Sequence, residues 1–139
     1  LVTNIRPAAM ARLGFGYEDC RALNKRLVYA AATGFGQDGP WAARPAFDEV
    51  VQAASGLASA IGTDEEPAFV PSLIGDKLCG LALTAAISAA LLRRERTGEG
   101  QLVEVPMLET ADGKHLVDQK NIGIHVHGNG KREACAHAA

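Results

Sequence analysis

The sequence predicts an α/β fold with parallel strands, on two observations. Strand-like apolar segments at residues 1–5, 26–32 and 101–105 alternate with segments that carry helical signals. Such alternation favours a parallel sheet whose strands are connected by helices. In addition, residues 78–96 form one long apolar helical segment, which is typical of a helix buried against a sheet. With 139 residues, 47% hydrophobic and 22% charged, the chain can form one domain with a modest core.

The first half of the chain is predicted to hold two strands and two short helices. The first strand lies at residues 1–5, and because a domain rarely begins within a strand, we expect further residues upstream. Pro7 opens a helix that runs to about Leu13 and is closed by Gly14. A second helix is expected at residues 17–23, and a strand at 26–32, although its alanines weaken the strand pattern.

The second half begins with a loop at residues 34–45, which holds three glycines and two prolines. Apolar side chains at helical spacing predict one helix over residues 46–61, ended by Gly62 and followed by a second loop. The long helix at 78–96 is apolar nearly all round, so we expect it to be buried. After a stop at residues 97–100, the pattern predicts a strand at 101–105 and the start of a helix at 107–110.

Composition excludes several classes of function. The formal net charge is −2 with both signs mixed along the chain, so nucleic acid is not expected as a partner. Three widely spaced cysteines, Cys20, Cys79 and Cys135, indicate reduced thiols in a cytoplasmic protein. No signal-peptide pattern is present, and the apolar stretch at 78–92 is shorter than a membrane span, so no membrane association is expected.

Two motifs with chemical potential are better explained as ordinary structure. Residues 34–39, Gly-Phe-Gly-Gln-Asp-Gly, match the dinucleotide fingerprint, but Pro40 follows where a helix would have to open at once. We therefore interpret them as a mobile loop and rank a nucleotide-binding module last. The tail holds metal-capable side chains without periodicity or scaffold, so we expect a loosely ordered segment and no metal site. These side chains are His125, His127, Cys135 and His137.

Two carboxylates stand at helix starts. Asp48 lies in the first turn of its predicted helix, and Asp76 lies just before the long apolar helix. An acid in such a place can simply accept backbone N–H bonds and interact with the helix dipole. The same environment favours the ionised form, which makes the carboxylate available as a nucleophile. Gly75 would give a substrate room to approach, and the residues alone leave both interpretations open.

A set of segments, in order and at matching spacing, resembles the family III CoA-transferases, the superfamily of formyl-CoA transferase, carnitine CoA-transferase and α-methylacyl-CoA racemase. The segments are residues 4–7, 12–17, 23–29, 34–40, 44–48, 52–53, 55–57, 74–76 and 94–101. The resemblance implies a fragment of a Rossmann-like parallel-sheet domain. Residues 1–110 would form part of the family domain, and residues 111–139 would be an atypical, poorly ordered tail.

The resemblance also implies a reaction. The aspartate at the position of Asp76 attacks an acyl-CoA thioester, and an aspartyl-CoA thioester then carries coenzyme A to a carboxylic acid acceptor. Asp48 would support it. The implied coenzyme A contacts are Asn4, Ile5, Ala9, Arg12 and Leu13, of which Arg12 suits a phosphate. A homodimer in the cytoplasm, without a metal, is implied as well.

Two alternatives accompany this interpretation. Racemases of the superfamily use a histidine where this chain has Phe47, and Phe cannot transfer a proton, so the racemase-like alternative is disfavoured. Family members are about three times longer, so the chain is alternatively a catalytically inactive fragment that only associates as an oligomer.

Overall fold

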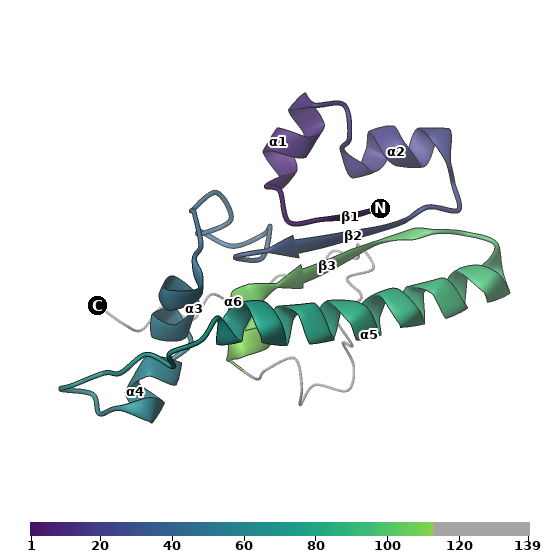
Figure 1. Cartoon of the computed structure of the whole chain (residues 1–139). Coiled ribbons are helices and arrows are strands. Elements are labelled where there is room, and N and C mark those ends of the chain that lie inside the picture. The colour runs from purple at the N-terminus through teal and green to yellow at the C-terminus, as the bar shows by residue number, and fades with distance from the viewer. Residues whose placement is uncertain (113–139) are drawn as a thin grey trace.

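A computed structural model describes residues 1–112 of the chain (Figure 1). The expectations for residues 113–139, including the four metal-capable side chains of the tail, lie outside this range, so the division at residue 110 stays a prediction. The elements are β1 (Val2–Thr3), α1 (Pro7–Arg12), α2 (Tyr17–Leu23), β2 (Val28–Thr33), α3 (Asp48–Ala54), α4 (Leu57–Ile61), α5 (Ile74–Thr97), β3 (Gln101–Pro106) and α6 (Met107–Ala111). The predicted alternation of strands and helices is confirmed.

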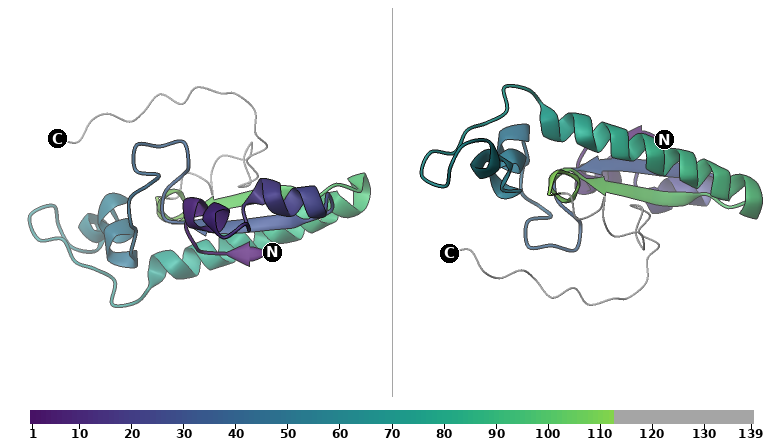
Figure 2. Two further views of the ribbon diagram at one scale, coloured as in Figure 1. Left: turned by 90° about the horizontal axis from the view of Figure 1, so that it is seen from above. Right: turned by 90° about the horizontal axis from the view of Figure 1, so that it is seen from below.

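The three described strands form one parallel sheet in the order β1-β2-β3. Val2 pairs with Ala30, and Ala30 pairs in turn with Val103. Helices α1 and α2 lie on one side of the sheet and α5 runs along the other, which gives three layers (Figures 1 and 2). The predicted parallel arrangement is therefore confirmed.

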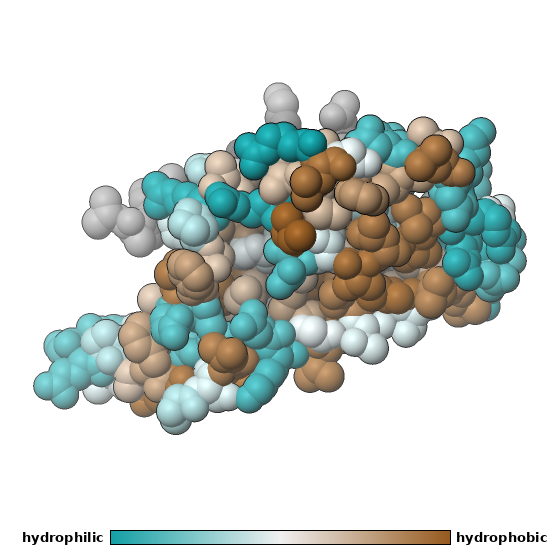
Figure 3. Space-filling view, turned by 45° about the horizontal axis from the view of Figure 1, so that its top comes forward, coloured by the Kyte–Doolittle hydropathy of each residue, from teal (hydrophilic) through white to brown (hydrophobic). Residues whose placement is uncertain are grey.

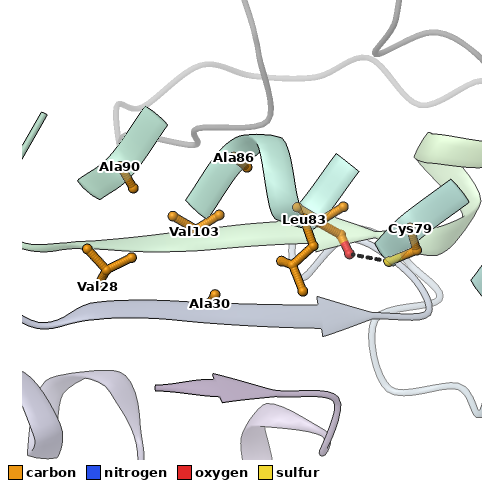
Figure 4. Packing of buried hydrophobic residues seen from close by; sticks show 8 residues of the cluster. Val28, Ala30, Cys79, Leu83, Ala86, Ala90 and Val103 are labelled. Atoms are coloured by element: carbon orange, nitrogen blue, oxygen red, sulfur yellow. Dashed lines mark hydrogen bonds between the residues drawn. The ribbon is translucent and has the colours of Figure 1, made fainter. Parts of the chain in front are cut away.

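The main core lies between the sheet and α5. Alternate residues of β2 and β3 point toward α5, because successive strand side chains face opposite sides. Small side chains on α5 let the helix approach the sheet closely, and the Cys79 thiol donates to the Val105 carbonyl across 3.5 Å (Figure 4). The buried cluster consists of Val28, Ala30, Cys79, Leu83, Ala86, Ala90, Val103 and Val105.

The opposite face of the sheet carries a smaller core under α1 and α2. It is built from Met10, Tyr29 and Ala31, with partly buried Tyr17 and Leu102 beside them. The Tyr29 hydroxyl donates to the Phe15 carbonyl at 2.9 Å, and its ring meets Tyr17 edge-on at 5.9 Å. These contacts hold the segment between β1 and β2 on the sheet.

The helix predicted at 46–61 is two helices in the structure. Gly56 lies between α3 and α4 with a φ of 81°, in the left-handed region, so the helix cannot continue through it. The apolar spacing persists across this break, which explains why the pattern predicted one helix. The long helix also differs, because α5 begins at Ile74 and so includes Asp76, which was predicted to precede it.

The expectation that the long helix is buried all round is wrong. A three-stranded sheet covers only one face of α5, and Leu81 and Leu92 on other faces are 71% and 55% exposed. Figure 3 shows apolar side chains gathered on one face of the molecule, with hydrophilic ones at the end where α5 finishes.

At 24 residues, α5 is also longer than predicted and could cross a membrane by length and composition alone. The core helix of a soluble protein passes the same test, and the packing on the sheet accounts only for the buried face of α5, which includes Cys79, Leu83 and Ala86.

Candidate active site

A cleft of about 520 Å³ lies at the carboxyl ends of the strands. Its walls come from residues just after β1, from the end of β2 and its following loop, from the start of α5 and from Met107 after β3. Asn4 and Asp76 both line it, although 72 positions separate them in the chain. The ends of parallel strands are the usual place for ligands in open α/β sheets, and a cleft of this volume suits a small ligand.

Asp48 is buried, 4% exposed, at the first position of α3. Its Oδ2 accepts the backbone N–H of Asp76 at 2.9 Å, and its Oδ1 accepts from Gln52 Nε2 at 2.8 Å. The N–H of Asp76 is one of the first amides of α5, which have no partner within the helix. Asp48 therefore caps α5 rather than its own helix, and fixes the backbone of Asp76.

Gly75 is buried beside this contact. A Cβ at residue 75 would lie 3.1 Å from Asp48 Oδ2 and 3.3 Å from both Met107 Sδ and Val51 Cγ1, tighter than ordinary packing. The expectation that Gly75 makes room for a substrate is wrong, because Asp48, Val51 and Met107 fill that space. The glycine instead lets the Asp48 carboxylate reach the start of α5.

The side chain of Asp76 differs from that of Asp48. It is exposed, it lines the cleft, and it accepts no hydrogen bond from any residue that the structure describes. Helix capping thus explains the carboxylate of Asp48 but not that of Asp76. An uncommitted carboxylate on a fixed backbone, at the helix end that favours negative charge, is suited to nucleophilic attack.

Cys79 lies one turn after Asp76 on α5 and also lines the cleft. Burial, together with the smaller effect of the nearby Asp76 charge, raises the pKa of this thiol to about 11. A thiol is a weak nucleophile in comparison with a thiolate, so Cys79 is inert at neutral pH. Cys79 and Cys20, the cysteines that the structure describes, are both free thiols, as predicted.

The predicted coenzyme A contacts divide into two groups. Asn4 lines the cleft with Asp76, whereas Ile5, Ala9, Arg12 and Leu13 are not part of its walls. Arg12 and Leu13 are exposed at the end of α1, beyond the cleft. A ligand that contacts both groups would have to extend from the cleft along α1.

The cleft also contains two arginines that were not predicted as site residues, although both lie in segments that resemble the family. Arg6 and Arg44 add two positive charges to its walls, and the Arg44 guanidinium lies 5.5 Å from the ring centre of Trp41. Arg44 opens the family-like segment 44–48, and the loop after β2 brings it into the cleft. Gln52, which does not line the cleft, could have been identified from the sequence as a partner of Asp48. It follows Asp48 by four residues on one helix, a spacing that lets Asp and Gln side chains form a hydrogen bond.

The glycine-rich segment at 34–39 begins a loop, as predicted, and α3 begins only at Asp48. Phe35 is buried and packs edge-on against Trp41 at 5.4 Å. A Cβ at residue 34 would lie 2.1 Å from the Ala46 Cβ, so Gly34 is needed for the loop to close on itself. The loop therefore forms a wall of the cleft, and the helix that a dinucleotide site requires directly after the glycines does not open there, because α3 begins only at Asp48.

Phe47 occupies a wall of the same cleft and is 68% exposed. Its ring cannot donate or accept a proton, so it adds an apolar surface near Asp76. Within residues 1–112, no group of three His, Cys, Asp or Glu side chains is arranged to hold a metal ion.

Comparisons with known proteins agree on one family. The family described as CoA-transferase family III matches residues 1–136. An acetyl-CoA:oxalate CoA-transferase from Acetobacter aceti is 44% identical over 114 residues, and a succinate–glutarate CoA-transferase from Agrobacterium fabrum is 36% identical over 110. Each alignment covers 78% of this chain, which spans about 28% of the length of these relatives. A CaiB/BaiF family protein from Brucella suis has a solved structure that matches with a TM-score of 0.77 and 32% identity, covering 82% of this chain and 30% of that one.

Proposed function

The chain belongs to CoA-transferase family III, and from this membership we propose that it moves coenzyme A between carboxylic acids, with Asp76 as the nucleophile. The observation that carries the proposal is the contrast at the start of α5. The backbone of Asp76 is fixed by Asp48, while its carboxylate remains open to the cleft. A group that must attack a substrate needs this combination of fixed position and free lone pairs.

The proposed reaction begins when an oxygen of Asp76 attacks the carbonyl carbon of an acyl-CoA. The carbon–sulfur bond breaks, coenzyme A leaves as a thiolate, and a mixed anhydride remains on Asp76. The thiolate then attacks the Asp76 carbonyl and releases the donor acid as a carboxylate, which leaves an aspartyl-CoA thioester. The acceptor carboxylate repeats these steps in reverse order, leaves as the new acyl-CoA and restores Asp76.

Binding of the acyl-CoA is proposed to involve Asn4 and Ile5 after β1, and Ala9, Arg12 and Leu13 on and after α1. Asn4 lies on the wall of the cleft that holds Asp76, so its amide is available to the reacting end of the substrate. Arg12 is exposed beyond the cleft, where its guanidinium suits a phosphate of coenzyme A. Asp48 supports Asp76 from behind the cleft wall.

Phe47 weighs against racemase-like chemistry at this site. A racemase must remove and return a proton at the α-carbon, which requires a basic group. The side chain of Phe47 supplies only apolar contact in the cleft.

Association with further polypeptide, including a second copy, is also part of the proposal. Both outer strands of the described sheet have an unpaired edge, and apolar side chains of α5 such as Leu81 are exposed. Such surfaces favour association. A homodimer in the cytoplasm is the arrangement we propose, and a fragment that associates without catalysis is the alternative.

The test is covalent capture at Asp76. The purified chain is incubated with a panel of short acyl-CoA thioesters, and the intact mass is measured before and after hydroxylamine treatment. We expect an adduct that hydroxylamine removes and that maps to Asp76. Asp76→Asn should abolish it, whereas Asp64→Asn, in an exposed loop, should not. A folded chain that forms no adduct with any thioester would support the inactive alternative.

A further inference from the structure

Gln52 lies one turn after Asp48 on α3, and its side chain is 2% exposed. Its Oε1 accepts the N–H of Val70 at 2.8 Å, and its Nε2 donates to Asp48 Oδ1 at 2.8 Å. The same Nε2 lies 3.3 Å from the carbonyl oxygen of Ser72 and 3.4 Å from that of Val70. Every polar atom of this buried amide is thus engaged, although Gln52 does not line the cleft.

The neighbours of Gln52 determine which end of its amide points where. The N–H of Val70 requires an acceptor, and the carboxylate of Asp48 requires a donor. An amide satisfies both requirements at once, while a carboxylate at this position has no donor unless it carries a proton. The site therefore selects glutamine over glutamate, although the two side chains have nearly the same shape.

These hydrogen bonds reach Asp76 by two routes. One runs through Asp48, whose second oxygen accepts the N–H of Asp76 at 2.9 Å. The other runs through Ser72, which lies two residues before Ile74, the first residue of α5. We propose that Gln52 is a positioning residue, which orients Asp48 and the segment leading into α5 so that the Asp76 carboxylate stays in the cleft. Its value for catalysis rests on the function proposed above.

The test replaces Gln52 by an isosteric group whose donor depends on pH. In Gln52→Glu, the introduced carboxyl can donate to Asp48 only while it is protonated, and two adjacent buried carboxyls retain one shared proton to a higher pH than usual. The backbone N–H of Asp76 faces Asp48 Oδ2, and Val51 and Met107 border the same space at Gly75. We expect the Asp76 amide to match wild type at low pH and, as pH rises, to depart from the wild-type signal at the same pH and to lose protection against hydrogen exchange.

Matched controls separate positioning from general stability. Gln101→Glu introduces the same chemistry at another buried glutamine, whose Oε1 accepts from Arg93 Nη1 at 2.9 Å at the opposite end of the sheet. At every pH, the Asp76 amide signal of this variant should match that of wild type. Gln52→Met keeps the volume and removes both polar ends, so the Asp76 amide should lose protection at every pH. Thermal melts of each variant at each pH report whether the fold is retained.

The rate of adduct formation at Asp76 supplies the functional readout. Gln52→Glu should be near wild type at low pH and about tenfold slower at pH 8, the effect of one displaced hydrogen bond. An Asp76 amide signal that is unchanged in both Gln52 variants, with only the melting temperature lowered, would overturn the proposal. If no variant forms an adduct, the proposed function fails, but the NMR result still decides the role of Gln52.

Discussion

The starts of α1 and α5 both border the cleft, but they are built differently. At α1, Arg6 caps the helix without a side-chain bond, and Pro7 provides the first turn from local sequence alone. At α5, the buried Asp48 carboxylate accepts the Asp76 N–H, the Gln52 amide donates to that carboxylate, and Gly75 leaves it the space to approach. The fold therefore fixes the backbone of the residue proposed to react, while proposed coenzyme A contacts such as Arg12 lie on exposed surface beyond the cleft.

Replacing the nucleophile should have the largest effect on activity. Asp76→Asn should lower the rate of thioester consumption by on the order of a thousandfold or more, because the amide cannot form the anhydride. The unfolding free energy should change by less than about 0.5 kcal/mol, since the side chain is exposed. Steady-state kinetics and chemical denaturation check both values. A variant that keeps a tenth of the activity would remove Asp76 from the mechanism.

The thiol of Cys79, near the start of α5, should be nearly unreactive toward alkylation at neutral pH. With the pKa of Cys79 raised to about 11 by burial, its thiolate fraction near pH 7 is roughly a hundredfold below that of an ordinary thiol. Alkylation of Cys79, followed by mass spectrometry, should accelerate steeply as pH approaches 11. Because the folded pKa lies above the unfolded one, this group also contributes stability at neutral pH that is lost as pH rises toward 11. Equal labelling rates in folded and denatured protein at pH 7 would contradict the burial of this thiol.

The carboxylate that caps α5 should matter for stability far more than the residue that caps α1. Asp48→Ala leaves the Asp76 N–H and an amide proton of Gln52 without their acceptor, which should cost about 2–3 kcal/mol of unfolding free energy. Arg6→Ala removes an exposed side chain with no capping bond and should cost less than about 0.5 kcal/mol. Urea denaturation measures the unfolding free energy of both variants. A similar decrease in both would contradict the proposed difference between the two helix starts.

Two glycines on α5, Gly75 and Gly80, differ in the space that an added methyl group would find. Gly75→Ala places a methyl 3.1 Å from Asp48 Oδ2 and should destabilise the fold by about 1–2 kcal/mol. A Cβ at Gly80 meets nothing within 4 Å, so Gly80→Ala should stabilise the helix by about 0.5–1 kcal/mol. The melting temperatures should therefore move in opposite directions. A rise for both variants would show that the Asp48 contact tolerates displacement.

The smallest effect is expected at the surface of α1. Arg12→Ala should weaken coenzyme A binding by roughly twofold to fivefold, the contribution of one exposed charge contact, and should leave the melting temperature unchanged. Titration calorimetry with coenzyme A measures it. An unchanged dissociation constant would exclude Arg12 from the binding surface.

The same two regions explain what the sequence could predict. Pro7 and Gly14 delimit α1 by local rules, so that helix was predicted to within one residue. The start of α5 was placed four residues late, because Asp48, 28 positions earlier in the chain, supplies its cap. The burial of α5 was overestimated for a similar reason, since apolar composition does not state how much sheet will cover it. Asp76 and Asp48 were identified as a pair, but only the structure separates the capping carboxylate from the open one.

The two carboxylates have different roles in this proposal. Asp48 caps α5 and holds its backbone, whereas Asp76 lines the cleft and attacks the substrate. Turnover of an acyl-CoA with an acceptor carboxylate enriched in oxygen-18 tests this proposal directly, because the acceptor oxygen that bridges the second anhydride stays on the residue that carried coenzyme A. Fragmentation of the peptide that contains both residues locates the label. We expect labelled oxygen in Asp76 and none in Asp48. Label in Asp48, or in neither residue after turnover, would contradict it.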